Sequence, residues 1–165
     1  MIRYLLGFLL VAVSAHTATL WYLPRLAMNT AMSRLEASGP ANQWIHVPPT
    51  DETSRRVVRP SPDLLYSVCL LDLSDGPVRI RAADWGDYMS LSLFAANTDN
   101  VFARNETRAG GDIEIEVSAG QGGDVGLGSD RGIALIRRLA PDDARIARAD
   151  TVRRENDICE AVSER

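Results

Sequence analysis

The stretch that decides the fold is LLYSVCLL at residues 64–71, a near-continuous apolar run of strand length. Pro62 precedes this run, and a Ser-Asp-Gly-Pro turn follows it at residues 74–77. A short apolar run between such turn signals is typical of a buried β-strand. We therefore expect a β-domain that is built outward from this strand.

The sequence after residue 77 repeats the strand pattern. Residues 78–81 alternate apolar and charged side chains, and further strand-like segments lie at residues 88–94, 112–117 and 132–139. Pro141-Asp142-Asp143 then resembles a helix start, and we expect the charged tail at residues 144–162 to be helical. Short strands with turn signals and a terminal helix predict a mainly β fold, as a small β-barrel or sandwich.

The first residues have a different character. Residues 4–23, YLLGFLLVAVSAHTATLWYL, carry no formal charge over twenty positions. At a rise of ~1.5 Å per residue, a helix of this length spans about 30 Å, the thickness of the bilayer's hydrocarbon core. A signal peptide cut after Ala15 is the alternative. The pair Trp21-Tyr22 favours an uncleaved transmembrane helix, because such rings lie at the headgroup level.

The chain divides into three parts. Residues 1–39 form the anchor and a juxtamembrane helix, which begins at Pro24 and stops at Ser38-Gly39-Pro40. Residues 40–62 are a proline-punctuated connector, and residues 63–165 form the β-domain with its helical tail. A short N-terminal tail before an apolar run is typical of a signal anchor, so we expect the domain to lie outside the cytoplasm.

Composition restricts the partners. The net charge of −4 divides unevenly, because Arg3, Arg25 and Arg34 against Glu36 leave +2 before residue 40 and −6 after it. An acidic domain argues against binding to nucleic acid or to an anionic lipid surface. All 18 basic residues are arginine, which excludes chemistry through a lysine Schiff base.

The chain has two cysteines, Cys69 in the apolar run and Cys159 near the C-terminus. In an oxidising compartment, a disulfide between them would attach the tail to the core. We favour the bridge over the alternative of one buried and one exposed thiol, although spacing alone does not show that the two cysteines lie close together.

Three ordered blocks resemble a known family. RPSPDLLYS (residues 59–67), LDLSDGP (71–77) and DYMSLSLFAANTDNV (87–101) are similar to the bacterial domain of unknown function 1254. The resemblance implies an all-β core and no established catalytic role, and it is closest to the short, membrane-anchored members. Longer members continue into a second β-domain, numbered 1214. Ser61 and Leu64 stand where longer members often have Asn and Thr, which weakens any polar site built from those side chains.

Few residues point to catalysis. Outside the apolar start the only histidine is His46, so a histidine metal site or a Ser-His-Asp triad is poorly supported, and we expect no metal, cofactor or catalytic residue. The candidate pocket or motif residues are polar and aromatic side chains close to the family blocks: Asp63, Tyr66, Trp85, Asp87 and Tyr88. They could line a cleft, or serve only as turn and core residues.

The sequence supports two candidate functions. The first is a single-pass protein of the bacterial inner membrane that presents a β-domain in the periplasm as an envelope accessory or interaction module. Its partner would be a separate membrane protein that carries the companion 1214-type domain. The second is a small-ligand binder or enzyme with a cleft lined by carboxylates and tyrosines. We favour the first, non-enzymatic role because the sequence lacks a recognisable catalytic set.

Overall fold

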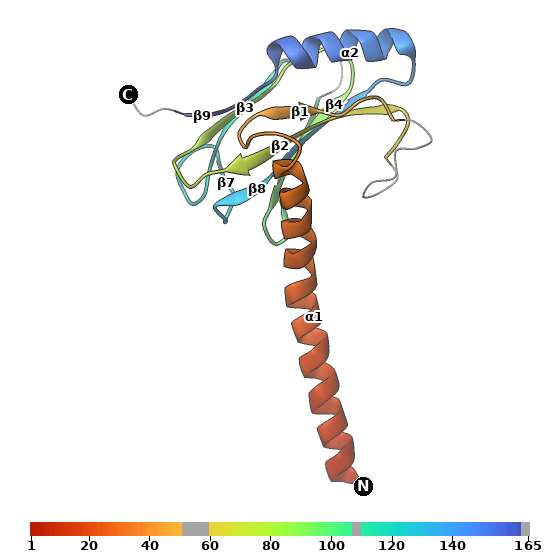
Figure 1. Cartoon of the computed structure of the whole chain (residues 1–165), viewed down its shortest axis with the longest axis vertical. Coiled ribbons are helices and arrows are strands. Elements are labelled where there is room, and N and C mark those ends of the chain that lie inside the picture. The colour runs from red at the N-terminus through yellow and green to blue at the C-terminus, as the bar shows by residue number, and fades with distance from the viewer. Residues whose placement is uncertain (51–59, 107–109, 163–165) are drawn as a thin grey trace.

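The structure, a computed structural model, describes residues 1–50, 60–106 and 110–162. A long helix, α1 (Ile2–Glu36), leads into a β-rich domain, near the end of which lies a second helix, α2 (Asp143–Asn156). Figure 1 shows α1 as a stem and α2 lying across the opposite end of the domain. The strands are β1 (Trp44–His46), β2 (Leu64–Asp72), β3 (Val78–Ala82), β4 (Met89–Ala95), β5 (Asn100–Glu106), β6 (Ile113–Ser118), β7 (Val125–Gly126), β8 (Arg131–Leu139) and β9 (Ile158–Ala161).

The strands of the described chain form two sheets. The large sheet has the order β1-β2-β8-β4-β5, and the small sheet has the order β7-β6-β3-β9. All pairings are antiparallel except that of β6 with β7. Buried side chains from both sheets form one continuous core. The mainly β prediction with a helix at each end is therefore confirmed. The barrel alternative is wrong, because the described strands form two open sheets and do not close.

Side-chain alternation explains how the strands divide between core and surface. In β8 the residues at even positions, from Gly132 to Arg138, are buried, while those at odd positions are half-buried. In β3, Val78 and Ile80 are fully buried and Arg79 between them is exposed. Period-two alternation is the pattern of a strand with one face on the core. All five predicted strands are present, with ends shifted by one residue at most.

Four of the strands were not predicted, and one of them is the two-residue β7. β1 lies in the segment expected to be a connector, and its Ile45 pairs with Val68 of β2. β5 is the exposed outer strand of the large sheet. β9 replaces the last part of the predicted helical tail, because α2 ends at Asn156 and Cys159 then pairs with Ile80 of β3. The rest of the predicted connector, residues 51–59, lies outside the described part of the chain.

Helix α1 is continuous through Pro24, where the sequence predicted that a separate juxtamembrane helix begins. Its last turns are not exposed stem, because Met28 and Met32 are buried against Leu70 of β2. The predicted stop is confirmed, since the backbone amides of Ser38 and Gly39 both donate to the carbonyl of Leu35. The stem thus runs directly into the domain and packs on the large sheet.

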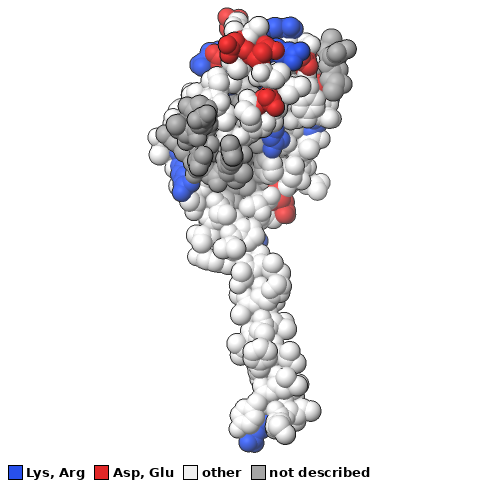
Figure 2. Space-filling model, turned by 90° about the vertical axis from the view of Figure 1, so that its right-hand side faces the viewer, with Lys and Arg blue, Asp and Glu red and all other residues white. Residues whose placement is uncertain are grey.

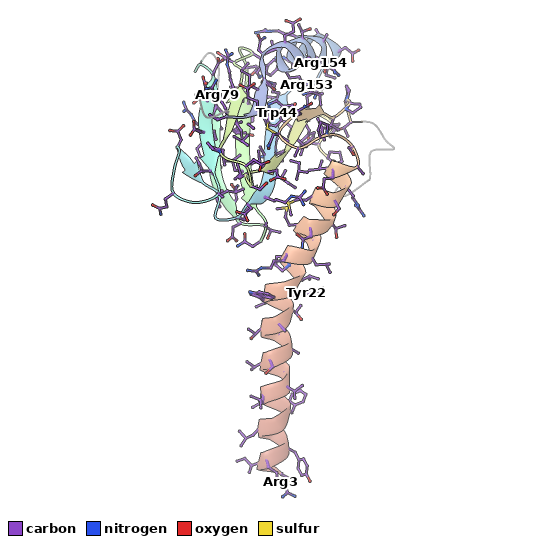
Figure 3. The ribbon with its side chains drawn as sticks, turned by 60° about the vertical axis from the view of Figure 1, so that its left-hand side comes forward. Arg3, Tyr22, Trp44, Arg79, Arg153 and Arg154 are labelled. Carbon is purple, nitrogen blue, oxygen red and sulfur yellow. A yellow bond between two sulfur atoms is a disulfide. The ribbon has the colours of Figure 1, made fainter. Side chains whose placement is uncertain are left out.

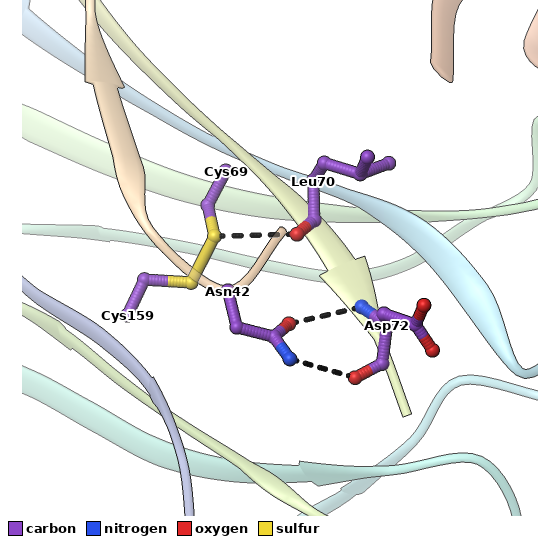
Figure 4. The surroundings of a disulfide bond; sticks show 5 residues. All are labelled: Asn42, Cys69, Leu70, Asp72 and Cys159. Atoms are coloured by element: carbon purple, nitrogen blue, oxygen red, sulfur yellow. Dashed lines mark hydrogen bonds between the residues drawn. A yellow bond between two sulfur atoms is a disulfide. The ribbon is translucent and has the colours of Figure 1, made fainter. Parts of the chain in front are cut away.

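The two sheets are joined by a covalent bond. Cys69 of β2 and Cys159 of β9 form a disulfide with a Cα–Cα distance of 6.8 Å (Figure 4), which confirms the predicted bridge. Beside it, the side chain of Asn42 pairs with the backbone of Asp72, donating to its carbonyl and accepting from its amide. These contacts hold the segment after α1 and the C-terminal strand to β2.

Helix α2 begins as the sequence predicted. The side chain of Asp142 accepts a hydrogen bond from the amide of Arg145 at 2.9 Å, which is an N-cap. Charged side chains gather on this end of the molecule, whereas the stem is almost free of them (Figure 2). The end of the domain that points away from the stem is therefore its charged end.

Candidate functional site

A buried ion pair lies beneath α2. Arg138 of β8 donates two hydrogen bonds to the carboxylate of Asp157, at 2.7 and 2.8 Å, and a third to the carbonyl of Ala83. The same carboxylate accepts the amide of Ala83 at 2.9 Å. The side chains of Arg138 and Asp157 are 1% and 0% exposed. A pair this buried and this well bonded fixes the segment after α2 against both sheets, and no external substrate reaches it.

A second buried arginine, Arg153, projects from α2 toward the edge of the large sheet, as Figure 3 shows from the side. It donates to the carbonyls of Tyr66 and Val47, at 2.7 and 3.0 Å, and to Asp150 of its own helix. Burial lowers the pKa of Arg153, while the hydrogen bond that Arg153 donates to Asp150 opposes that shift. Arg153 therefore attaches α2 to β2 and to the end of β1.

His46, the one histidine outside the stem, lies beside this cluster. Its Nδ1 is 3.0 Å from the hydroxyl of Ser67. Burial lowers the pKa of His46, and the positive charge of Arg153 lowers it further. A neutral imidazole next to a serine hydroxyl is chemically suited to activate a nucleophile. Ser67, however, is 1% exposed, so the pair contributes packing and hydrogen bonding rather than a reaction centre.

The predicted candidate residues separate into different environments. Asp63 is exposed, and its backbone carbonyl accepts the amide of Ala140. Tyr66 is half-buried, and its hydroxyl accepts the amide of Ser61 at 3.0 Å. Tyr88 lies next to Leu139 of β8 and is also half-buried. Tyr66 lies on β2, and Tyr88 immediately precedes β4. The strand register, continued by one residue, places both on the same face of the large sheet, with β8 between them.

The other two candidates face elsewhere. Trp85 is 2% exposed and belongs to the core, with its indole N–H donating to the carbonyl of Tyr88. Asp87 accepts the amide of Tyr88 and lies 3.7 Å from Arg145. Such contacts are those of a loop that caps the start of β4. The structure thus brings the two tyrosines to one face and places Trp85 in the core.

A hollow lies on the surface of the protein where the β-domain meets α1. It has a volume of about 460 Å³ and is lined by α1, the β4–β5 turn and the β7–β8 loop. Arg25 and Asn29 contribute from α1, Asn97 and Asp99 from the turn, and Ser129 from the loop. None of the predicted candidate residues lines it. Within residues 1–50, 60–106 and 110–162, no group of three His, Cys, Asp or Glu side chains could hold a metal ion.

Sequence reasoning missed the buried arginines and this hollow. Arg138 carried a signal, because it occupies an inward position in the alternation of residues 132–139. Arg153 carried none, since it is one of several arginines on a charged helix. The hollow depends on turns that are distant in sequence, and only the folded chain brings them to α1.

Comparison with solved structures shows the fold. The structure is similar to that of the VPA0106 protein from Vibrio parahaemolyticus, with a TM-score of 0.63 at 17% identity. The match covers 90% of this chain and 40% of the Vibrio chain. A putative uncharacterized protein from Burkholderia cenocepacia is also similar, with a TM-score of 0.47 at 20% identity, over 75% of this chain and 37% of that one. This chain therefore spans less than half the length of either protein.

Among curated proteins, no relative matches the chain. A family model, described as "Protein of unknown function (DUF1254)", matches residues 41–158. The match includes β1 to β8 and the whole of α2, ends at the first residue of β9, and confirms the resemblance seen in the three sequence blocks. The chain belongs to the DUF1254 family.

Proposed function

We propose that the chain is a single-pass protein of the bacterial inner membrane, whose β-domain lies in the periplasm and pairs with a second envelope protein. The observation that carries this proposal is the form of α1. It is long and apolar enough to span a membrane, and none of its most apolar stretch is buried in the protein. Arg3 and Tyr22, labelled in Figure 3, lie near the two ends of the uncharged span.

The junction between stem and domain supports a tethered role. Met28 and Met32 pack on Leu70 only a few residues after the span, so the domain is held close to the bilayer instead of swinging on a linker. The disulfide supports an oxidising compartment, because such bridges persist outside the cytoplasm. Together these features favour a rigid module presented at the periplasmic surface of the membrane.

The proposed partner is a separate membrane protein that carries a companion 1214-type domain, as the family resemblance implies. The acidic domain makes nucleic acid an unsuitable partner.

Purification from native membranes tests the partner. The full chain with a C-terminal affinity tag is extracted in mild detergent, and mass spectrometry identifies the proteins that co-elute. We expect one envelope protein in stoichiometric amount. The matched control is a tagged chain that ends at residue 39 and keeps the stem without the domain. A protein that co-elutes equally with both, or a full chain that elutes alone, contradicts a partner bound by the β-domain.

A reporter fusion tests the orientation separately. Alkaline phosphatase is active only where its disulfides form, so a fusion after Arg165 is expected to be active in a bacterial host. An inactive phosphatase on a chain that remains in the membrane would place the domain in the cytoplasm and overturn the proposed topology.

A further inference from the structure

We propose that the hollow at the foot of the domain binds the headgroup of an aminoethyl phospholipid, phosphatidylethanolamine, from the membrane that α1 spans. This inference rests on the proposed membrane anchoring. The hollow lies between α1 and the lower ends of the two sheets, which face along the stem in Figure 1. Its position, charges and rigidity each support this ligand.

The depth of the hollow matches the headgroup layer. The uncharged span ends at Leu23, and at ~1.5 Å per residue Arg25 and Asn29 lie about 3 and 9 Å beyond it along the helix. The headgroup region is about 5–8 Å thick on each side of the hydrocarbon core. Arg25 therefore lies within the headgroup layer, at the level of the lipid phosphates, and Asn29 lies at the outer edge of that layer.

The hollow carries one charge of each sign. Arg25 is on its α1 wall and Asp99 is on the β4–β5 turn. Phosphatidylethanolamine presents a phosphate and an ammonium group in one headgroup, and a guanidinium and a carboxylate are suited to bind these two groups. An anionic headgroup lacks the ammonium, so Asp99 repels it. A choline headgroup has no N–H to donate to Asp99.

Both charged groups are held in place. The guanidinium of Arg25 lies 4.3 Å from the centroid of the Trp21 ring and donates to the carbonyl of Trp21 at 2.6 Å. Arg25 makes no other hydrogen bond to the described residues, so further N–H donors remain for a phosphate. Asp99 accepts from the side-chain amide of Asn97 at 2.6 Å, and its own amide donates to the Asn97 side chain at 3.1 Å.

The walls of the hollow are also joined to each other. The hydroxyl of Ser129, on the β7–β8 loop, accepts the amide of Ala96 from the β4–β5 turn at 3.2 Å. The same hydroxyl donates to the carbonyl of Arg131 at 2.8 Å. The two loops that face α1 therefore keep their spacing, which is what a site requires to distinguish one headgroup from another. A volume of about 460 Å³ is within the usual range for ligand pockets.

The test is native mass spectrometry of the purified full chain in mild detergent, titrated with phosphatidylethanolamine, phosphatidylcholine or phosphatidylglycerol of the same acyl chains. We expect one phosphatidylethanolamine per chain, bound about tenfold more tightly than the other two lipids. Arg25→Gln should weaken its binding by about tenfold, because the phosphate loses a charged donor. Asp99→Asn should abolish the preference over phosphatidylglycerol.

Matched controls carry the same charge changes elsewhere. Arg3→Gln removes an arginine that lies over a ring, 5.1 Å from the Tyr4 centroid, at the other end of the span. Asp75→Asn removes an exposed carboxylate in the β2–β3 turn. Both should bind lipid as the unsubstituted chain does, and thermal melting should show that Arg25→Gln is folded. Equal binding of the three lipids, or undiminished binding by Arg25→Gln, overturns the inference.

Alkaline carbonate extraction separates this inference from the proposed function. If carbonate releases the chain from membranes, the membrane anchor itself is wrong and the lipid site falls with it. If the chain stays in the membrane and shows no headgroup preference, only the lipid site is wrong.

Discussion

Arg138 and Asp157 form a bidentate ion pair, and their side chains are 1% and 0% exposed. The pair joins β8 to the residue that follows α2. Through Ala83 the same pair also holds the segment after β3. One buried contact thus fixes three parts of the chain that are far apart in sequence. It keeps the C-terminal helix on the sandwich and positions β9 for pairing with β3.

Removing one member of this pair should be costly. Asp157→Asn leaves the Arg138 guanidinium buried without its counter-charge, and we expect the free energy of unfolding to fall by about 3–5 kcal/mol. Arg138→Met combined with Asp157→Asn should cost less than the sum of the two single changes, because the two side chains interact. Urea unfolding of the full chain in detergent, followed by circular dichroism, measures both effects.

An exposed pair provides the control for that experiment. Arg79 and Glu160 lie 3.9 Å apart, and their side chains are 48% and 58% exposed. Glu160→Gln should change the free energy of unfolding by less than about 0.5 kcal/mol, because water screens this pair. A loss as large as that of Asp157→Asn would show that burial is not the reason for the effect.

The disulfide should be present in the native protein and should matter for stability. It closes a loop with a sequence separation of 90 residues. In the chain-entropy model, replacing both cysteines with alanine lowers the free energy of unfolding by about 4–5 kcal/mol. Mass spectrometry after alkylation without reductant, on protein taken from native membranes, tests the bond directly. Two alkylated thiols would exclude the bridge, and with it the support for an oxidising compartment.

His46 should make the domain less stable in mild acid. Its pKa is lowered on folding by burial and then by Arg153, so the unfolded chain binds the proton more readily than the folded one. Stability from neutral His46 is then fully present above pH ~6.5 and is lost as the pH falls through the lowered pKa. We expect His46→Asn to flatten the fall in urea-unfolding stability between about pH 7 and 5.

The carboxylates give this pH experiment an internal reference. Hydrogen bonds from Ser74 lower the pKa of Asp72, and hydrogen bonds and charges from arginines on α2 lower the pKa of Asp150. Stability from these groups is present above pH ~4 and is lost at lower pH, so His46→Asn should leave that loss unchanged. If His46→Asn unfolds with the same profile as the unsubstituted chain from pH 7 to 5, the imidazole does not titrate on folding.

The contact between α1 and the large sheet should stabilise the folded chain. Met32 is 4% exposed and packs against Leu70, whereas Leu26 on the same helix is 45% exposed. Met32→Ala should lower the free energy of unfolding by about 2 kcal/mol, and Leu26→Ala by less than about 0.5 kcal/mol. Hydrogen exchange of β2 in detergent should rise for Met32→Ala only. Similar exchange for both variants would mean that α1 does not pack on the sheet in solution.

The strands that were found from sequence share one property: each has a face in the core. Residues 78–81 and 132–139 can be recognised as strands because their apolar and polar side chains alternate. β5 lacks this signal, since most of its residues are exposed at the edge of the sheet. The composition of the charged tail predicts a helix where β9 lies, and only the pairing of β9 with β3 makes it a strand.

The candidate site was harder to foresee than the fold. Asp63, Tyr66, Trp85, Asp87 and Tyr88 are candidates because they lie in or close to the family blocks. Neighbours in sequence that stand on a strand or turn point in different directions, and here Trp85 enters the core while Tyr88 faces outward. The hollow at Arg25 and Asp99 joins residues more than seventy positions apart, so no local pattern marks it.

What the sequence alone determined is local: an apolar span long enough for a membrane, a helix stop at Ser38-Gly39-Pro40, and five strands with their inward faces. Hydropathy, helix-stopping residues and side-chain alternation each involve only a few neighbouring residues, so they can be recognised in the sequence before the fold is known. Only the tertiary structure decided that two sheets form instead of a barrel, that Cys159 meets Cys69, and that Arg138 and Arg153 are buried. These outcomes depend on contacts between segments that are distant in sequence. Such contacts stabilise the protein only after folding has brought the two segments together.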